Sequence, residues 1–236
     1  MQKYIDAHCH ILTPVQMASA NDCGVGRFIV NATNRADWAT IAKIADGKSV
    51  YGAIGIHPWF VSEIDTNWDD EMVDTLARNP HLMVGEIGLD KNHPNMPAQL
   101  SVFRRGLQIA HDMGRVVHVH CVGCWGKVNE ILRESALPPM VVFHCFSGSP
   151  ELASELSQIC NAYFSFGSSV LNTKSTRTRA AVASVPENRI LVESDAMDVA
   201  TPTVIPDVVR EIAKIRGVDN DTMADTIYAN TMGLLK

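Results

Sequence analysis

The chain has 236 residues, of which 46% are hydrophobic and 19% are charged, and it carries a formal net charge of −6. This length and composition provide a sizeable hydrophobic core and exclude a disordered chain. The negative charge excludes a protein that binds nucleic acid tightly through basic residues alone, although bound divalent cations would reverse the field locally at a site.

The start of the chain lacks the basic and apolar regions of a signal peptide, and no apolar run reaches the length of a membrane span. The six cysteines are scattered along the chain, which favours reduced thiols over a disulfide framework. We therefore expect a cytoplasmic protein with no membrane partner. We expect it to fold as a single domain over residues 1–236 and to be a monomer or weak oligomer.

Eight apolar runs that lack polar alternation are predicted to be strands covered on both faces. In chain order they span residues 3–8, 27–32, 50–56, 83–87, 116–120, 141–144, 162–166 and 190–193. Segments of helical period are predicted at residues 36–46, 69–79, 97–113, 125–134, 150–160, 174–184, 202–216 and 221–235. This alternation predicts an α/β fold of the (β/α)8 TIM-barrel type. A doubly wound sheet is the alternative, but no glycine-rich dinucleotide-binding sequence follows any strand.

The first predicted strand leads into Asp6-Ala7-His8-Cys9-His10. Side chains alternate between the two faces of a strand, so His8 and His10 are expected to point the same way where the strand ends. Two imidazoles that converge in this way suit a transition metal. For these two residues taken alone, a partly buried pair hydrogen-bonded to backbone is the alternative.

Later predicted strands also end in residues of types that bind metals. The sequences at these ends are GIHP (55–58), GEIGLD (85–90), HVHC (118–121), HCFSG (144–148) and ESD (193–195). In a (β/α)8 barrel, the chemistry lies at the C-terminal ends of the strands. We therefore expect one polar site there, built from His8, His10, Glu86, His120, His144 and Asp195.

This donor set is sufficient for two divalent cations, because a glutamate such as Glu86 has two oxygens and bridges ions about 3.5–4 Å apart. Histidine with carboxylate suits zinc or manganese, and magnesium suits a carboxylate-rich position. Water held by such ions becomes a nucleophile near neutral pH. A neighbouring carboxylate accepts its proton, a role that we assign to Asp195.

In sequence and order, these motifs resemble the TatD family of metal-dependent hydrolases. The resemblance rests on DAHCH (6–10), GIHP, GEIGLD, VHVHC (117–121), HCFSG and LVESDA (191–196), together with Ala229-Asn230, and covers essentially the whole chain. It implies a TIM barrel with a dinuclear site, in which His8, His10 and Asp195 bind one metal and His120 and His144 bind the other, with Glu86 as the bridge. Many members are deoxyribonucleases that cleave phosphodiester bonds, and some relatives are deacylases of misacylated tRNA.

Three stretches depart from the family pattern. Val122-Gly123 stands in place of an Arg-Asp pair, Lys91 in place of an aromatic residue, and Ala196-Met197-Asp198 with a short connection to Pro202 in place of an Ala-Pro-Tyr loop. In the family these stretches contact substrate rather than metal. The resemblance therefore implies an intact metal site with an altered substrate pocket.

Three further residues are predicted to bind substrate. His57 would hold substrate oxygens, with a structural turn before Pro58 as the alternative. Asp90 either orients a ligand histidine or closes a loop. Lys91 and Arg177 are candidates to bind an anionic group of the substrate, with a solvent-exposed surface charge as the alternative for each.

Several of the predicted ligands have a structural alternative. Glu86 could be a solvated carboxylate at the barrel rim, His144 a core histidine, and Asp195 a helix N-cap. His118 shares a face with His120 and is expected to lie one layer lower, behind the ligands.

Three cysteines stand next to predicted ligands. Strand alternation would turn Cys9, Cys121 and Cys145 towards the helix layer as core thiols.

These predictions together indicate a metal-dependent hydrolase, with a TatD-like deoxyribonuclease acting on DNA ends or single strands as the first expectation. One alternative is a deacylase-type enzyme that hydrolyses a small-molecule ester, lactone or amide at the same dinuclear site. A non-catalytic metal-binding scaffold is the other alternative, and the complete ligand set favours an enzyme over it.

Overall fold

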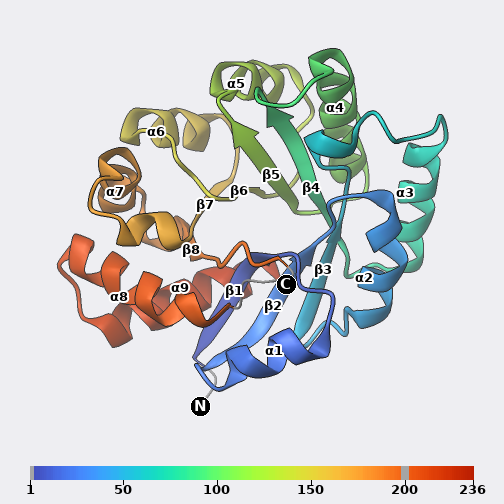
Figure 1. Ribbon diagram of the computed structural model, residues 1–236. Coiled ribbons are helices and arrows are strands. Elements are labelled where there is room, and N and C mark those ends of the chain that lie inside the picture. Colours follow the sequence, from blue (N-terminus) through green and yellow to red (C-terminus); the bar gives the residue numbers. More distant parts are fainter. Residues whose placement is uncertain (1–2, 198–201) are drawn as a thin grey trace. The chain divides into compact units, whose positions relative to one another are not determined.

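The computed structural model describes residues 3–197 and 202–236 (Figure 1). Eight strands form one sheet in chain order. They are β1 (Tyr4–Cys9), β2 (Val25–Asn31), β3 (Val50–Ile54), β4 (Met83–Asp90), β5 (Val117–Val122), β6 (Val141–Phe143), β7 (Ala162–Phe166) and β8 (Ile190–Val192). Pairing is parallel from β3 to β6 and between β7 and β8, and β8 lies against β1. The predicted (β/α)8 fold is confirmed.

Helices alternate with the strands. They are α1 (Pro14–Asn21), α2 (Trp38–Ile44), α3 (Trp68–Arg78), α4 (Met96–Asp112), α5 (Trp125–Glu134), α6 (Pro150–Ile159), α7 (Thr176–Ser184), α8 (Ile205–Arg216) and α9 (Asn220–Leu234). Helix α1 was not predicted, because its eight residues carry almost no apolar stripe. The predicted helices at 36–46 and 202–216 each begin instead with a short 3₁₀ turn, η1 (Arg35–Asp37) and η5 (Pro202–Val204).

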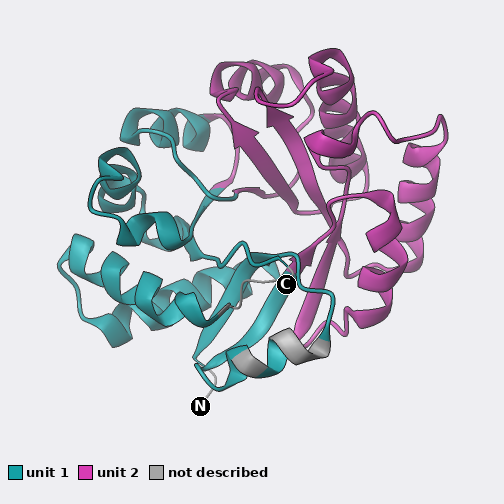
Figure 2. Cartoon of the chain, viewed as in Figure 1, with its two compact units in different colours: residues 1–29, 144–158, 163–236 teal, residues 30–143, 159–162 magenta. Residues whose placement is uncertain are grey.

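The chain divides into two compact units (Figure 2). Unit 1 comprises residues 1–29, 144–158 and 163–236, and unit 2 comprises residues 30–143 and 159–162. Unit 1 therefore holds β1, β8 and helices α8 and α9, and unit 2 holds β3 to β6 and helices α2 to α5.

Within unit 2, β4 is the longest strand, and all eight of its residues are buried. Helix α4 packs on it with the face that carries Phe103 and Leu107, both of which are fully buried. Gly106 allows this approach, because a Cβ there would lie 2.8 Å from Cδ1 of Ile87. The polar residues of β4 are thus held in a rigid, dry setting.

Many of the buried polar side chains in the described residues lie in strands or just after strand ends. Those that bear on the site are Asp6, His8, His57, Glu86, Asp90, His118, His120, His144 and Glu193, each less than a tenth exposed. Burying so many ionisable groups is costly unless they bind one another or a ligand. These residues thus form a polar part of a mostly apolar core.

No helix in the described ranges is long and apolar enough to cross a membrane. All six cysteines are free thiols. Of the predicted departures from the family pattern, Asp198 and the connection to Pro202 lie outside the described residues.

Candidate metal centre

The first group of candidate ligands lies in unit 1, where β1 and β8 end side by side. We call His8, His10, His144 and Asp195 the β1/β8 cluster. The Nε2 atoms of His8 and His10 lie 3.3 Å apart, and Oδ1 of Asp195 lies 3.9 Å and 3.4 Å from them. The predicted convergence of His8 and His10 on one side of the strand is therefore confirmed.

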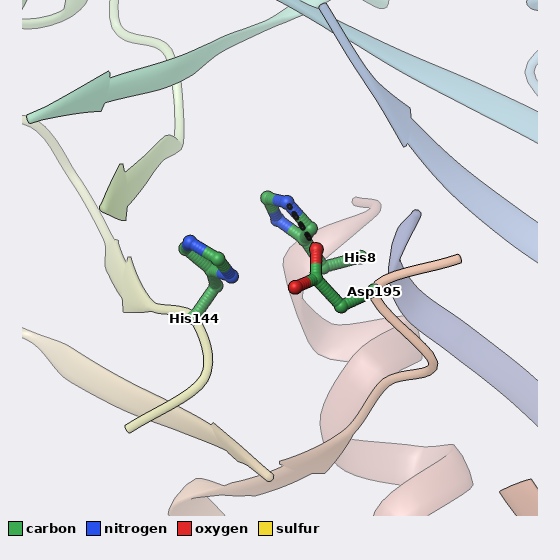
Figure 3. Close-up of side chains that lie close together, drawn as sticks. All are labelled: His8, His144 and Asp195. Carbon is green, nitrogen blue, oxygen red and sulfur yellow. Dashed lines mark ion pairs between the residues drawn. The ribbon is translucent and has the colours of Figure 1, made fainter. Parts of the chain in front are cut away.

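His144 completes this cluster (Figure 3). Its ring stacks on that of His8 with centroids 4.0 Å apart. His8, His144 and Asp195 each offer a ligand atom, and these atoms all lie within 4.8 Å of one another. The alternative of a core histidine enclosed by apolar groups does not describe His144, because its neighbours are ligand-type residues.

Asp195 is held in an unusual backbone conformation. Its φ is +51°, in the left-handed region that non-glycine residues seldom adopt, and its N–H donates to the carbonyl oxygen of His8. The backbone from residue 193 to residue 197 is irregular, so Asp195 does not cap a helix and that alternative is wrong. The conformation instead aims its carboxylate at His8 and His10.

A buried carboxylate, Glu193, lies behind His144. Its Oε1 accepts the N–H of Cys145 at 2.6 Å and lies 3.7 Å from Nδ1 of His144. Burial opposes ionisation of Glu193, but the interaction with His144 outweighs it and holds the pKa of Glu193 below its ordinary value. A carboxylate behind a ligand histidine orients the ring and strengthens it as a donor.

Cys145 does not face the helix layer, which corrects the prediction made for it. The residue is exposed, and its Sγ lies 3.7 Å from Oδ2 of Asp195. Its φ of +44° places it beyond the regular part of β6, so strand alternation no longer applies. Loss of solvation among the neighbouring groups, together with the charge of Glu193, raises the pKa of this thiol. Cys9 and Cys121 are buried as predicted.

Asp6 joins the ends of β1 and β8. Its carboxylate accepts the Ser194 hydroxyl at 2.5 Å, the Ser194 N–H at 2.9 Å and the His8 N–H at 3.3 Å. Complete burial raises the pKa of Asp6 to about 7, against the opposing effect of these hydrogen bonds. Because Ser194 precedes Asp195, the contact fixes two ligands relative to each other. Sequence reasoning gave Asp6 and Glu193 no role, although both stand in the quoted motifs.

The second group lies in unit 2, and we call His57, Glu86 and His120 the β4/β5 cluster. Oε1 of Glu86 lies 2.8 Å from Nδ1 of His120 and 3.5 Å from Nε2 of His57. Glu86 is 1% exposed, so the alternative of a solvated carboxylate at the rim is wrong. Gly88 sets the packing of the two strands, because a Cβ there would lie 1.9 Å from the carbonyl oxygen of His120.

The hydrogen bonds of His57 fix its tautomer. Its Nδ1 accepts the N–H of Trp59 at 3.2 Å, which caps the 3₁₀ turn η2 (Pro58–Phe60). A neutral imidazole carries one N–H, so the hydrogen is assigned to Nε2. This atom lies 3.2 Å from Nδ1 of His120 and near Glu86. His57 is thus both the turn residue and a donor aimed at the cluster.

Asp90 supports His120 from the other side. Its Oδ2 lies 3.6 Å from Nε2 of His120 and accepts the indole N–H of Trp59 at 2.8 Å. Burial raises the pKa of Asp90, but the hydrogen bonds from Trp59 and Asn92 more than offset this, and the pKa lies below its ordinary value. The structure thus favours the first alternative for Asp90, which is to orient a ligand histidine.

The remaining predicted residues lie at the edge of this cluster or away from it. Lys91 is exposed, and its aliphatic chain lies over Gly123, where a Cβ would come within 2.3 Å of it. His118 is fully buried beside Gly85. Arg177 is an exposed residue of α7.

Both clusters fit a divalent cation. Each gathers imidazole nitrogens and carboxylate oxygens at short range, which is the donor set of zinc and manganese sites and admits magnesium where carboxylate dominates. In addition, Oε2 of Glu193 is buried with no hydrogen-bond partner among the described residues, as expected beside a site completed by a bound group. The residues present are therefore consistent with metal binding.

Comparisons with known proteins agree with this chemistry. The model of the family described as TatD related DNase matches residues 5–236. The chain is 26% identical over 253 residues to the uncharacterized metal-dependent hydrolase YjjV of Escherichia coli K12, covering 98% of this chain and 97% of that protein. It is 26% identical over 240 residues to the 3'-5' ssDNA/RNA exonuclease TatD of the same organism, covering 92% and 90%.

A solved structure adds to the likeness. The crystal structure of the E. coli YjjV protein, a TatD homologue, superposes with a TM-score of 0.90 at 26% identity and covers 99% of this chain and 98% of that one.

Proposed function

The chain belongs to the TatD related DNase family of metal-dependent hydrolases, and on this premise we propose that it cleaves phosphodiester bonds at the ends of single-stranded nucleic acid. The proposal draws its substrate from relatives such as the E. coli 3'-5' ssDNA/RNA exonuclease TatD. The observation that carries it is the pair of compact donor clusters, one in each unit, which together contain all six ligands that the family resemblance implies.

As part of the proposal, the chain binds two divalent cations, which are zinc, manganese or magnesium. The proposed ligands are the six residues that the family resemblance implies: His8, His10, Glu86, His120, His144 and Asp195. When bound, such cations acidify water and offset negative charge on a phosphoryl group. The other parts of the reaction fall to groups of this chain.

Asp195 is the proposed proton acceptor. Its side chain is 38% exposed, so a proton taken from the attacking water is able to pass on to solvent or to the leaving group. Glu86 is nearly inaccessible to solvent and is suited to holding charge in place rather than to exchanging protons. The protein therefore assigns different duties to its two catalytic carboxylates.

His57 is the proposed donor to a substrate oxygen. Its Nδ1 accepts the Trp59 N–H, and its Nε2–H faces His120 and Glu86; in the complex with substrate this N–H is proposed to donate to a phosphoryl oxygen, where it would meet developing negative charge. Asp90 and Glu193 keep His120 and His144 in position, and Lys91, which is exposed, is proposed to meet the substrate's anionic chain. The six free cysteines support a reducing, cytoplasmic location, and we propose a monomer or weak oligomer.

The test is hydrolysis of a substrate panel by protein that has been stripped of metal and reloaded with manganese, zinc or magnesium. The panel contains a short single-stranded DNA, the matching RNA, a chromogenic phosphodiester, an ester and a lactone. We expect metal-dependent shortening of the nucleic acids, its loss in His8→Ala and its retention in His81→Ala, a histidine exposed to solvent. Turnover of the ester or lactone alone would overturn the nuclease proposal in favour of a deacylase-type enzyme.

A further inference from the structure

A large aromatic side chain stays exposed beside the β4/β5 cluster. Trp59 is 44% exposed, and among the described residues the other large apolar side chains this open are Leu171 and Met197. Trp59 belongs to the η2 turn, which begins directly after His57. An exposed indole next to buried ligand-type residues marks a place where a flat, apolar group is able to bind.

The Trp59 ring is fixed rather than free. Its indole N–H donates to Asp90 Oδ2 at 2.8 Å, and its ring stacks on His93 with centroids 4.6 Å apart and planes 20° apart. Asp90 is itself held, because its N–H donates to Gln99 and its carboxylate accepts the Asn92 N–H. A ring that is already immobilised loses little conformational entropy when it binds a ligand.

Two routes connect the ring to the predicted ligands. The first route runs through Asp90, because the Oδ2 atom that accepts the indole N–H of Trp59 also lies 3.6 Å from Nε2 of His120. The second route runs through His57, whose ring meets that of Trp59 edge-on with centroids 4.8 Å apart. Nε2 of His57 in turn lies 3.2 Å from Nδ1 of His120 and 3.5 Å from Oε1 of Glu86. The exposed indole is therefore one side chain away from two predicted ligands.

The charge of the chain makes such a surface useful for the proposed substrate. With a net charge of −6, the protein has no general attraction for a polyanion. Affinity for a single strand then has to come from bound cations and from contacts that do not depend on charge. Stacking of a base on an aromatic ring is such a contact, and it tolerates any base because each presents a π-face.

We propose that Trp59 is a nucleobase-stacking platform, which holds the base of a nucleotide next to the scissile phosphate. The proposal rests on the proposed nuclease function and names the part of the substrate that this surface recognises. The opposing explanation is that Trp59 only anchors the loop and positions Asp90. The two explanations differ in whether the effect of Trp59 depends on a base in the substrate.

The experiment compares a short single-stranded DNA with oligonucleotides of the same length that lack the base at one of the last three positions. Trp59→Ala is expected to lower kcat/KM for the intact strand by about 5- to 150-fold. For the strand that lacks the stacked base, wild type and Trp59→Ala should be nearly equal. Trp59→Phe keeps an aromatic face without the indole N–H and should recover most of the activity.

Leu171→Ala removes a comparably exposed apolar side chain, 39% exposed, in unit 1 and serves as the control. Leu171→Ala should leave kcat/KM unchanged for every oligonucleotide. Melting temperature and metal content are measured for all variants, and Trp59→Ala should match wild type in both. An equal loss of activity on intact and base-free strands would overturn stacking and make Trp59 a positioning residue.

A binding measurement separates this proposal from the nuclease proposal. Fluorescence anisotropy of labelled strands with metal-stripped protein gives Kd without turnover, and Trp59→Ala should raise Kd for the intact strand alone. If wild type cleaves no strand, the nuclease function fails, and this base-dependent change in Kd still decides whether stacking occurs. Equal Kd values for wild type and Trp59→Ala on the intact strand would overturn the platform.

Discussion

The two donor clusters place their carboxylates in opposite settings. Asp195 of the β1/β8 cluster is 38% exposed, follows the end of a strand and has a left-handed backbone. Glu86 of the β4/β5 cluster is 1% exposed and lies within a fully buried strand. A group that moves protons needs access to solvent, whereas a group that only holds a cation benefits from a rigid, dry position. Under the proposed function, this contrast favours proton transfer in unit 1 and charge-holding in unit 2.

Each cluster also has a carboxylate behind a histidine, but the two are built differently. Glu193 lies behind His144 and receives a backbone N–H, whereas Asp90 lies behind His120 and receives the indole N–H of an exposed tryptophan. Glu193 is therefore held by backbone inside unit 1, whereas Asp90 is held by a side chain that is open to solvent and so accessible to substrate. Substrate binding is expected to act on His120 more than on His144.

The largest expected effect comes from Asp195→Asn. This change keeps the size of the side chain and removes its ability to accept a proton, so kcat on single-stranded DNA should fall by about 100- to 10,000-fold. Steady-state kinetics together with metal content measures the effect. Full activity with unchanged metal content would contradict the assignment of proton transfer to unit 1.

His57→Ala should have the next largest effect. Loss of a hydrogen bond to a charged phosphoryl oxygen costs about 1.5–3 kcal/mol, which corresponds to a loss in kcat/KM of roughly 10- to 150-fold. Metal content should be unchanged, because the proposal gives His57 the role of a hydrogen-bond donor and does not count it among the ligands. A variant that loses a metal would show instead that His57 is a ligand, and the contrast between the clusters would need revision.

Glu193→Gln tests the internal support of unit 1. The substitution preserves volume and removes the charge next to His144, so metal affinity should fall by about 10- to 100-fold. Competition with a chromogenic chelator gives the affinity directly. Asp90→Asn is the matched change in unit 2. It should weaken the binding of single-stranded DNA as well as metal binding, because it also weakens the hydrogen bond that holds the Trp59 indole. If the two variants lost metal affinity and DNA affinity to the same extent, the proposed difference between Glu193 and Asp90 would be contradicted.

Gly88→Ala should have the smallest effect among these variants and should act on stability rather than chemistry. The new Cβ would meet the backbone of His120, and overpacking of this kind costs about 1–3 kcal/mol. Urea unfolding measures the change. Gly126→Ala in α5 is the control, since nothing lies within 4 Å of its Cβ and alanine favours a helix. Equal stability of Gly88→Ala and wild type would contradict the close packing of β4 on β5.

Most of the fold and the proposed ligands were accessible from the sequence because both depend on local periodicity. Alternation along β1 places His8 and His10 on one side, and the apolar runs without polar alternation mark the buried strands. Helix α1 was missed because the apolar residues of its sequence form almost no helical stripe. The predicted and observed helix boundaries differ where a 3₁₀ turn precedes an α-helix, because both kinds of helix begin with similar residues.

The supporting contacts were not accessible, because they join residues far apart in the chain. Asp6 and Ser194 are separated by 188 positions, and Glu193 and Cys145 by 48. No spacing rule connects such pairs, and their charges alone do not distinguish a supporting group from a ligand. Cys145 was misplaced for a different reason, since its positive φ ends the alternation on which the prediction depended.

The count of metal ions per chain tests the central claim most directly. Wild type, His8→Ala and His120→Ala are purified without chelator, reloaded with manganese or zinc and analysed by elemental mass spectrometry, with His81→Ala as the control. The account predicts about two cations per chain in wild type and in the control, as in other two-metal hydrolytic sites, and a clear loss in each of the other variants. Fewer than one cation in reloaded wild type, or full occupancy in both ligand variants, would contradict it.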